Sequence, residues 1–208
     1  MLRIGLGYGI IGAHDPGGGD IVTKPQTRDA YIVFDVEAAG PSPGRYALLS
    51  IGACTLGEPR QTFYVELQPD REAFTAEAMT VSGLSLEKLT AQGTPAAEAM
   101  QRLADWLAQV VPAGARPVFV AWNAPFDWMF VSEYFHRYLG RNPLGHAALD
   151  LKTYYMGLHG VSWQGTSYGE ASRRYLDHRD LEHHALADAL NAAEILEAML
   201  AEQKEEKQ

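Results

Sequence analysis

The segment that most constrains the fold is the strand-forming run YIVFDVE at residues 31–37. Side chains alternate across a β-strand with a period of two, so Asp35 and Glu37 project from the same face of this strand. Two neighbouring carboxylates repel each other unless a cation lies between them, and their hard oxygen atoms suit Mg²⁺ or Mn²⁺. An isolated D-x-E is more often a solvated strand edge, so the interpretation depends on what the rest of the chain places beside it.

The length and composition of the chain predict a single globular domain. With 208 residues, 47% of them hydrophobic, the chain can bury one sizeable core. It has no apolar run near the ~20 residues that span a bilayer, and its start lacks a clear secretory signal. Cys54 is the single cysteine and cannot form an internal disulfide. We therefore expect a soluble, cytoplasmic protein.

The charge of the chain limits the way in which it can bind nucleic acid. A formal net charge of −9 argues against a broadly basic binding surface, because such surfaces gain most of their affinity by neutralising phosphates. Carboxylates that hold divalent cations would account for several of these negative charges. A polyanionic substrate therefore remains possible, provided that it is held locally.

The first 28 residues are rich in glycine and predict a flexible arm. Within this arm, residues 7–12 match the dinucleotide-binding pattern G-x-G-x-x-G. That pattern requires a strand before it and a helix at its end, whereas too few residues precede this match and glycine and proline follow it. A dinucleotide-binding oxidoreductase is an alternative that rests on this match alone. We expect the folded domain at residues 29–201 and a charged tail at residues 202–208.

Hydrophobic periodicity and turn residues predict an α/β fold in which helices pack against the faces of a mixed sheet. The expected strands, the first three forming an antiparallel meander, are residues 31–37, 45–56, 61–67 and 117–122. The expected helical segments are 74–79, 85–89, a longer helix after Thr94 and Pro95, a helix that includes Phe126, 149–158 (helical or simply buried), 168–175 and 184–199. Thr94 fits the N-cap of its helix and Pro95 the first helical position.

Two further acids stand at the ends of predicted elements. Asp127 follows a strand-to-helix turn, and Asp188 lies early in the last helix. Acids in such places can converge at one edge of a sheet, unlike charges scattered over helix surfaces. Their local contexts are specific: residues 123–127 read N-x-x-F-D, and residues 183–188 read H-x-A-x-x-D.

Taken in order, D-x-E, N-x-x-F-D and H-x-A-x-x-D resemble the three motifs of the DnaQ-like 3′-to-5′ exonucleases, the histidine-bearing branch of the DEDD superfamily. The resemblance covers residues 31–199, which is nearly the whole chain apart from its two ends. It implies a ribonuclease H-like fold with a mixed five-stranded sheet, an antiparallel meander followed by parallel strands, and removal of nucleotides from a 3′ end.

The resemblance also implies roles for individual residues. The four acids Asp35, Glu37, Asp127 and Asp188 would hold two Mg²⁺ or Mn²⁺ ions, and His183 would be the general base. Two such ions can activate a water on one side of a phosphate and stabilise the leaving oxygen on the other, and an imidazole can accept a proton near neutral pH.

The neighbouring His184 competes with His183 for the role of general base. His184 precedes Asp188 by four residues, so a continuous helix would place these two side chains on one face. In the sister branch of the superfamily a tyrosine occupies a place like that of His184. The H-x-A-x-x-D register, with Ala185 in its usual place, instead selects His183.

Several other residues are candidates for substrate binding. By resemblance, the loop VSGL at residues 81–84 would pack against the terminal nucleotide through Ser82, Gly83 and Leu84. Asn123 would bind substrate, orient the site or simply cap a helix. Ala38 stands where the family commonly has a threonine, so a hydrogen bond to substrate would be lost without affecting the metal ligands. Four aromatic side chains could stack on bases, although such residues more often belong to a core: Tyr154, Tyr155, Trp163 and Tyr168.

The sequence therefore predicts a metal-dependent 3′-to-5′ exonuclease that acts on single-stranded DNA or RNA ends, or on short oligonucleotides, and releases nucleoside 5′-monophosphates. Its expected partner is a single-stranded 3′ end, with a DNA polymerase or another repair protein as a candidate protein partner and no membrane. The alternative is a non-catalytic nucleic-acid-binding or polymerase-associated module on the same fold. The complete set of chemical residues disfavours this alternative, because a binding module does not need them.

Overall fold

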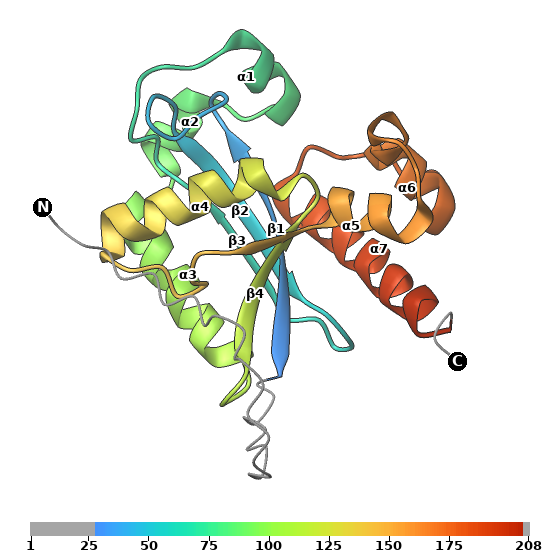
Figure 1. Cartoon of the computed structure of the whole chain (residues 1–208). Helices are drawn as coiled ribbons and strands as arrows, with labels where there is room; N and C mark the ends of the chain where they lie inside the picture. Colours follow the sequence, from blue (N-terminus) through green and yellow to red (C-terminus); the bar gives the residue numbers. More distant parts are fainter. Residues whose placement is uncertain (1–27, 206–208) are drawn as a thin grey trace, which may run out of the picture.

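One mixed β-sheet forms the centre of the structure, a computed structural model that describes residues 28–205 (Figure 1). Its spatial order is β3-β2-β1-β4-β5. β1 pairs antiparallel with β2 and parallel with β4. The strands are β1 (Asp29–Ala38), β2 (Leu48–Thr55), β3 (Thr62–Glu66), β4 (Arg116–Ala121) and β5 (Ala148–Asp150). The predicted five-stranded sheet, a meander followed by parallel strands, is confirmed.

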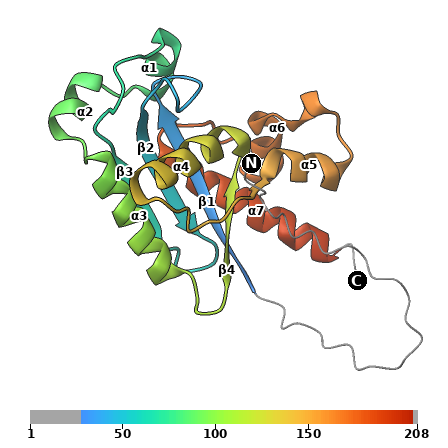
Figure 2. The same cartoon turned by 60° about the vertical axis from the view of Figure 1, so that its left-hand side comes forward.

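Helices cover both faces of this sheet (Figures 1 and 2). They are α1 (Ala76–Ser82), α2 (Leu86–Gln92), α3 (Ala96–Val110), α4 (Ala124–Leu139), α5 (Leu151–His159), α6 (Tyr168–Tyr175) and α7 (Ala185–Glu205), with a 3₁₀ turn η1 (Trp163–Thr166). α3 and α4 share one core with the sheet, and α5 and α7 share the other. Between residues 28 and 205, none of these helices has the length and apolar character needed to cross a bilayer.

The central strand β1 distributes its side chains between these two cores. Ile32 and Phe34 face the core of α3 and α4, where the ring of Phe34 stacks on that of Phe119 with centroids 4.4 Å apart. Val33 faces the core of α5 and α7. Since the strand alternates, Asp35 lies on the side of Val33 and is directed towards the face that α7 covers.

Four local features differ from the sequence prediction. Strand β5 and the turn η1 are short elements within segments expected to be helical, buried or loop. Pro95 occupies the N-cap position of α3 with no capping side chain, so the predicted N-cap role of Thr94 is wrong; the Thr94 hydroxyl instead accepts a hydrogen bond from Arg102 at 3.4 Å. α7 continues through Glu205 because Glu202 accepts hydrogen bonds from Arg174 and Tyr175 of α6.

Residues 1–27 of the predicted N-terminal arm, which include its G-x-G-x-x-G match, lie outside the described residues.

A glycine on β2 allows the start of α7 to approach the sheet closely. A Cβ atom built on Gly52 would overlap with the carbonyl group of Ala185 and with the backbone nitrogen of Leu186. Both obstacles are backbone, so no side-chain movement can relieve the overlap. Gly52 therefore determines how near the first turn of α7 lies to β1, because Gly52 pairs with Asp35 in the sheet.

We predict that Gly52→Ala lowers the free energy of unfolding by about 1–3 kcal/mol, the usual range for overpacking a close contact. Urea unfolding followed by circular dichroism measures this change. The matched control is Gly157→Ala in α5, where an added methyl group meets nothing within 4 Å. This control should leave stability unchanged or raise it by up to about 1 kcal/mol. Equal effects of the two substitutions would contradict the prediction.

Candidate active site

The sheet places the two acids of D-x-E at the carboxyl end of its central strand. Asp35 pairs with Gly52 and Glu37 pairs with Ser50 across β2. The register shifts between Glu37 and Ala38, which marks the end of regular pairing. β2 pairs with β1 along both acids, whereas the pairing of β4 with β1 ends at Val33, so the two carboxylates are presented from a strand that is held on the β2 side.

The third acid reaches the same place from α4. Asp127 lies in the first turn of this helix and is only 3% exposed. Its Oδ1 accepts a hydrogen bond of 3.0 Å from the backbone nitrogen of Val36, which lies between the two acids of β1. The first residue of α4, Ala124, donates its backbone N–H to Asp150 Oδ1 at 3.0 Å. These bonds fix the start of α4 against the carboxyl ends of β1 and β5.

The fourth acid and the histidine come from the start of α7. Asp188 is 4% exposed, and its Oδ1 accepts a hydrogen bond of 3.0 Å from the backbone nitrogen of Glu182. His183 has a positive φ of 52° and is exposed. Ligand atoms of Glu37, His183 and Asp188 all lie within 4.8 Å of one another. The structure thus brings residues from β1 and from the loop before α7 into one cluster.

The pKa values of the acids show that all four form a single electrostatic cluster. Burial raises the pKa of Asp35 well above its ordinary value, and the negative charges of the other three acids raise it further. Burial and then the charge of Asp188 raise the pKa of Glu37 to about 7. Burial also raises the pKa of Asp127 and that of Asp188, although backbone hydrogen bonds oppose the shift in both. A cation would relieve this repulsion.

The donor set fits divalent cations. Asp127 and Asp188 each accept a backbone N–H at Oδ1, from Val36 and from Glu182 respectively. Glu37, Asp188 and His183 offer two carboxylates and a ring nitrogen close enough to share one cation, and the charges of Asp35 and Asp127 act on the same cluster. Hard oxygen ligands of this kind suit Mg²⁺ and Mn²⁺. The structure thus brings together the acids and the histidine of the three motifs, whereas their roles as metal ligands and as general base stay predictions.

The two neighbouring histidines point to different surroundings. The ring of His184 stacks on that of Tyr64 from β3, with centroids 4.6 Å apart. Its Nδ1 accepts the backbone N–H of Ala187 at 3.4 Å, so His184 lies just outside α7, at its N-terminal end. The helical argument for His184 fails because α7 begins only at Ala185. His183 alone of the two joins the acids.

A cavity of about 410 Å³ lies beside Glu37, and its lining differs from the predicted substrate loop. Ser82 and Gly83 end α1: Ser82 is buried, and Gly83 adopts a left-handed C-cap with φ of 63°. Neither they nor Leu84 line this cavity. Its lining is Glu37, Ala38, Gly40, Pro41, Thr75, Glu77, Ala78, Val81 and Phe126. Sequence reasoning did not assign Phe126 to substrate, although it is the phenylalanine of N-x-x-F-D.

Asn123 and the aromatic candidates are also placed by the structure. Asn123 stands at the N-cap position of α4 with a left-handed φ of 64°, but its side chain makes no capping hydrogen bond. Tyr154, Tyr155 and Tyr168 pack in or against the core of α5 and α7. In contrast, the side chain of Trp163 is 55% exposed.

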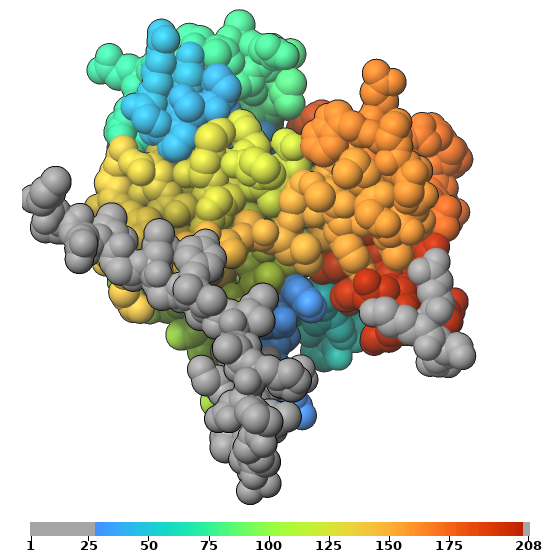
Figure 3. Space-filling model, in the orientation of Figure 1, coloured from blue at the N-terminus to red at the C-terminus, as the bar shows by residue number. Residues whose placement is uncertain are grey.

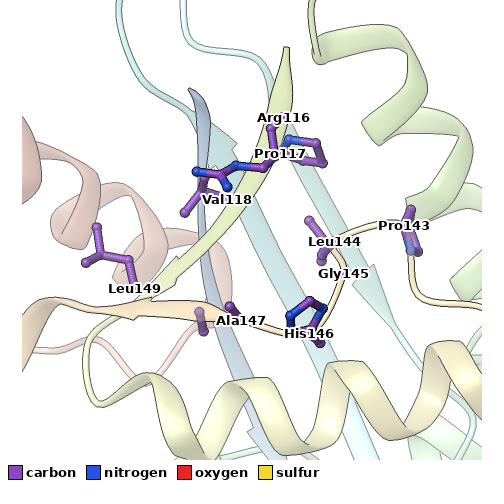
Figure 4. Close-up of a pocket in the computed structure, with 10 residues that line it drawn as sticks. Arg116, Pro117, Val118, Pro143, Leu144, Gly145, His146, Ala147 and Leu149 are labelled. Atoms are coloured by element: carbon purple, nitrogen blue, oxygen red, sulfur yellow. The ribbon is translucent and has the colours of Figure 1, made fainter. Parts of the chain in front are cut away.

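A second cavity, of about 380 Å³, lies at the opposite end of β4 from the acids (Figure 4). Residues from the start of β4 line one side of it, and residues from β5 and the segment before it line the other: Arg116, Pro117, Val118, Pro143, Leu144, Gly145, His146, Ala147, Ala148 and Leu149. The first residues of β4 form this cavity, whereas the acidic cluster lies beyond its last residues. The two sites are therefore separate.

The fold and the acidic cluster together define a class of protein, a ribonuclease H-like α/β nuclease domain. Residues 32–196 match the exonuclease family RNase_T. The chain is 44% identical over 168 residues to the 3′-5′ DNA exonuclease Cap18 of Escherichia coli, covering 81% of this chain and 90% of that protein. The chain therefore belongs to the exonuclease family.

Solved structures confirm the fold at low sequence identity. The nuclease domain of 3′hExo, a DEDDh family member bound to rAMP, matches with a TM-score of 0.67 and 14% identity, covering 83% of this chain and 91% of that one. Exonuclease I of E. coli with a dT13 oligonucleotide matches with a TM-score of 0.65 and 16% identity, covering 86% of this chain and 42% of that one. The predicted ribonuclease H-like fold is confirmed.

We predict that the ionised carboxylate of Glu37 lowers the stability of the cation-free folded protein in a pH-dependent way. Because the folded-state pKa of Glu37 is about 7, above its ordinary 4.5, the folded state binds the proton more tightly than the unfolded state. The stabilisation that the folded state gains by binding this proton is fully present below about pH 4.5 and is lost as the pH rises through 7. In EDTA, Glu37→Gln should therefore gain in Tm relative to the unmodified protein between pH 5 and 7.5.

Thermal unfolding at a series of pH values measures this difference. The control is Glu87→Gln on α2, an exposed carboxylate in contact with water, for which the difference in Tm should stay flat. Saturating Mg²⁺ should reverse the order at pH 7.5, because only the carboxylate form binds the cation. A flat profile for Glu37→Gln in EDTA would refute the electrostatic account.

Proposed function

We propose that the protein is a metal-dependent 3′-to-5′ exonuclease that acts on single-stranded DNA ends and releases nucleoside 5′-monophosphates. The observation that carries this proposal is the convergence of four acids and His183 from β1, α4 and α7 in a member of the exonuclease family. The preference for DNA is supported by the 44% identical relative, which is named as a DNA exonuclease. We further propose a cytoplasmic location.

Each residue of the cluster has a role in this proposal. Asp35, Glu37, Asp127 and Asp188 would hold two Mg²⁺ or Mn²⁺ ions, which when bound would polarise the scissile phosphate, activate water and stabilise the leaving 3′ oxygen. His183 would accept the proton of the attacking water at a ring nitrogen. Its exposure would let that proton pass on to solvent.

The cavity beside Glu37 would receive the terminal nucleotide. The apolar side chains of Val81 and Phe126 line it together with Ala38, and they offer surface to a base or a sugar. Ala38 carries no hydroxyl, so this position would contribute shape rather than a hydrogen bond. Asn123, whose side chain does not cap α4, is free in this proposal to contact substrate or a bound water. A polymerase or repair protein remains the proposed type of protein partner.

The direct test is digestion of a 5′-labelled single-stranded DNA 20-mer beside the matching RNA. We expect a ladder that shortens from the 3′ end with Mg²⁺ or Mn²⁺, stops in EDTA and is slower on RNA. Asp35→Asn keeps the shape of the side chain and should reduce the rate at least about 100-fold, because one metal ligand loses its charge. The control Asp105→Asn changes an exposed acid on α3 and should leave the rate unchanged. Equal rates of Asp35→Asn and the unmodified protein would refute the proposal.

The two histidines provide a second test. His183→Ala should lower kcat by roughly 10²–10⁴-fold, the usual contribution of a general base. His184→Ala removes the stacking on Tyr64 and the contact with Ala187, so it should lower Tm with little change in kcat. Steady-state rates on the DNA 20-mer, together with melting curves, separate these effects. A larger loss of kcat in His184→Ala would show that the general base has been assigned wrongly.

A further inference from the structure

Trp163 is a large apolar side chain with an unusual degree of exposure. Its side chain is 55% exposed, whereas Tyr154, Tyr155 and Tyr168 from the same region pack in or against the core. It belongs to η1, which follows α5 after a left-handed turn at Gly160 with φ of 62°. That turn brings the chain back beside α5. The exposed indole is therefore held by a defined element between two helices.

A lysine lies over the ring of this tryptophan. Lys152 Nζ is 4.2 Å from the centroid of the Trp163 ring, within the range of a cation–π contact. Within residues 28–205, Lys152 forms no ion pair with a carboxylate. Its charge is therefore available to an anionic ligand. An exposed aromatic surface beside an unpaired cation matches the chemistry of a nucleotide, which has a flat base and a phosphate.

The pair lies close in sequence to residues that interact with the acidic cluster. Lys152 is two residues beyond Asp150, so their Cα atoms are at most about 7 Å apart. Asp150 accepts the backbone N–H of Ala124 at the start of α4, and its charge is one of those that raise the pKa of Asp127. On the other side, η1 leads into Tyr168, whose pKa is raised to about 12 by burial and then by the charge of Asp188. Asp150 and Tyr168, which flank the pair in the sequence, thus interact electrostatically with members of the acidic cluster.

The distribution of charge explains why such a local contact is needed. The net charge is −9, and seven of the arginines form ion pairs with carboxylates: Arg60, Arg71, Arg116, Arg137, Arg173, Arg174 and Arg179. An acidic surface repels the DNA backbone beyond the metal site. In the space-filling view, the surface is notched between the segment around α1 and that around α5 and α6 (Figure 3). The pair lies on the α5 side of the site.

We propose that Trp163 and Lys152 form a second contact for single-stranded DNA, in which the indole stacks on a base at least two nucleotides upstream of the terminal one and the ammonium group neutralises the phosphate of that nucleotide. This inference rests on the proposed function, because it concerns the same strand. It extends that function by assigning a subsite outside the reacting centre. It also implies that the enzyme distinguishes a strand several nucleotides long from a dinucleotide.

The test compares a 12-nucleotide single-stranded DNA with a dinucleotide. In Trp163→Ala we expect the KM for the 12-mer to rise about tenfold, the usual effect of losing one stacked base. The rate on the dinucleotide, which is too short to occupy the second contact, should not change. Trp163→Phe keeps a ring and should retain most of the affinity. Melting temperatures equal to that of the unmodified protein would show that the variants remain folded.

Fluorescence anisotropy in EDTA measures binding without hydrolysis. Lys152→Ala should weaken binding of a labelled 12-mer and reduce the slope of log Kd against log salt by about 0.7, as expected for one lost phosphate contact on a single strand. The control Lys204→Ala removes the same charge at the far end of α7, about 24 Å along the helix from Asp188. It should change neither affinity nor slope.

The outcomes separate this inference from the proposed function. If the unmodified protein binds the 12-mer through Trp163 and Lys152 but hydrolyses nothing, the proposed function fails and the contact stands. If the protein hydrolyses DNA and Trp163→Ala has the same KM for the 12-mer as the unmodified protein, the contact is refuted and the function stands. An equal loss on the dinucleotide would also refute it, because Trp163 would then act on the reacting centre.

Discussion

Repulsion among four carboxylates is the interaction on which the rest of this structure depends. Asp127 and Asp188 are almost completely buried; burial raises the pKa of all four acids, and the charges of neighbouring acids raise the pKa values of Asp35, Glu37 and Asp127 further. Without a cation such an arrangement is unfavourable, so surrounding backbone must hold it. The N–H groups of Val36 and Glu182 do so, and Gly52 allows α7 to come close enough. Holding the four carboxylates together lowers the stability of the cation-free protein, and binding of divalent cations would restore it.

Most of the fold could be predicted because local sequence agrees with tertiary environment. β1 alternates between two cores, and Ser167 caps α6 where the pattern predicts a helix. The exceptions have causes outside their own segments. β5 has three residues and merges into the apolar start of α5, so periodicity cannot separate them. The end of α7 is ordered by contacts of Glu202 with α6, which lies about 30 residues away in sequence.

The positions of the four acids could be predicted because each stands near the beginning or end of a strand or helix. The contacts around these acids could not be predicted from the sequence. Helical spacing favours His184, and only the positive φ of His183 and the start of α7 at Ala185 show why His183 meets the acids. The predicted substrate loop contributes only Val81 to the cavity beside Glu37. Val81 lies within α1 and faces the cavity, whereas Gly83 ends the helix in a left-handed conformation. The left-handed conformation of Gly83 agrees with the preference of glycine for this region, whereas the positive φ of His183 leaves little trace in residue type.

An acidic enzyme that acts on a polyanion must concentrate its attraction at the reacting end. The arginines that form ion pairs with carboxylates contribute little net field, so the strongest attraction for phosphate would come from cations held by the acids themselves. Attraction that depends on bound cations acts over a short range and is strongest at the cluster. Such a protein would hold a strand by its terminus and bind its interior weakly. Under the proposed function, recognition of ends would therefore follow from the same carboxylates that hold the cations.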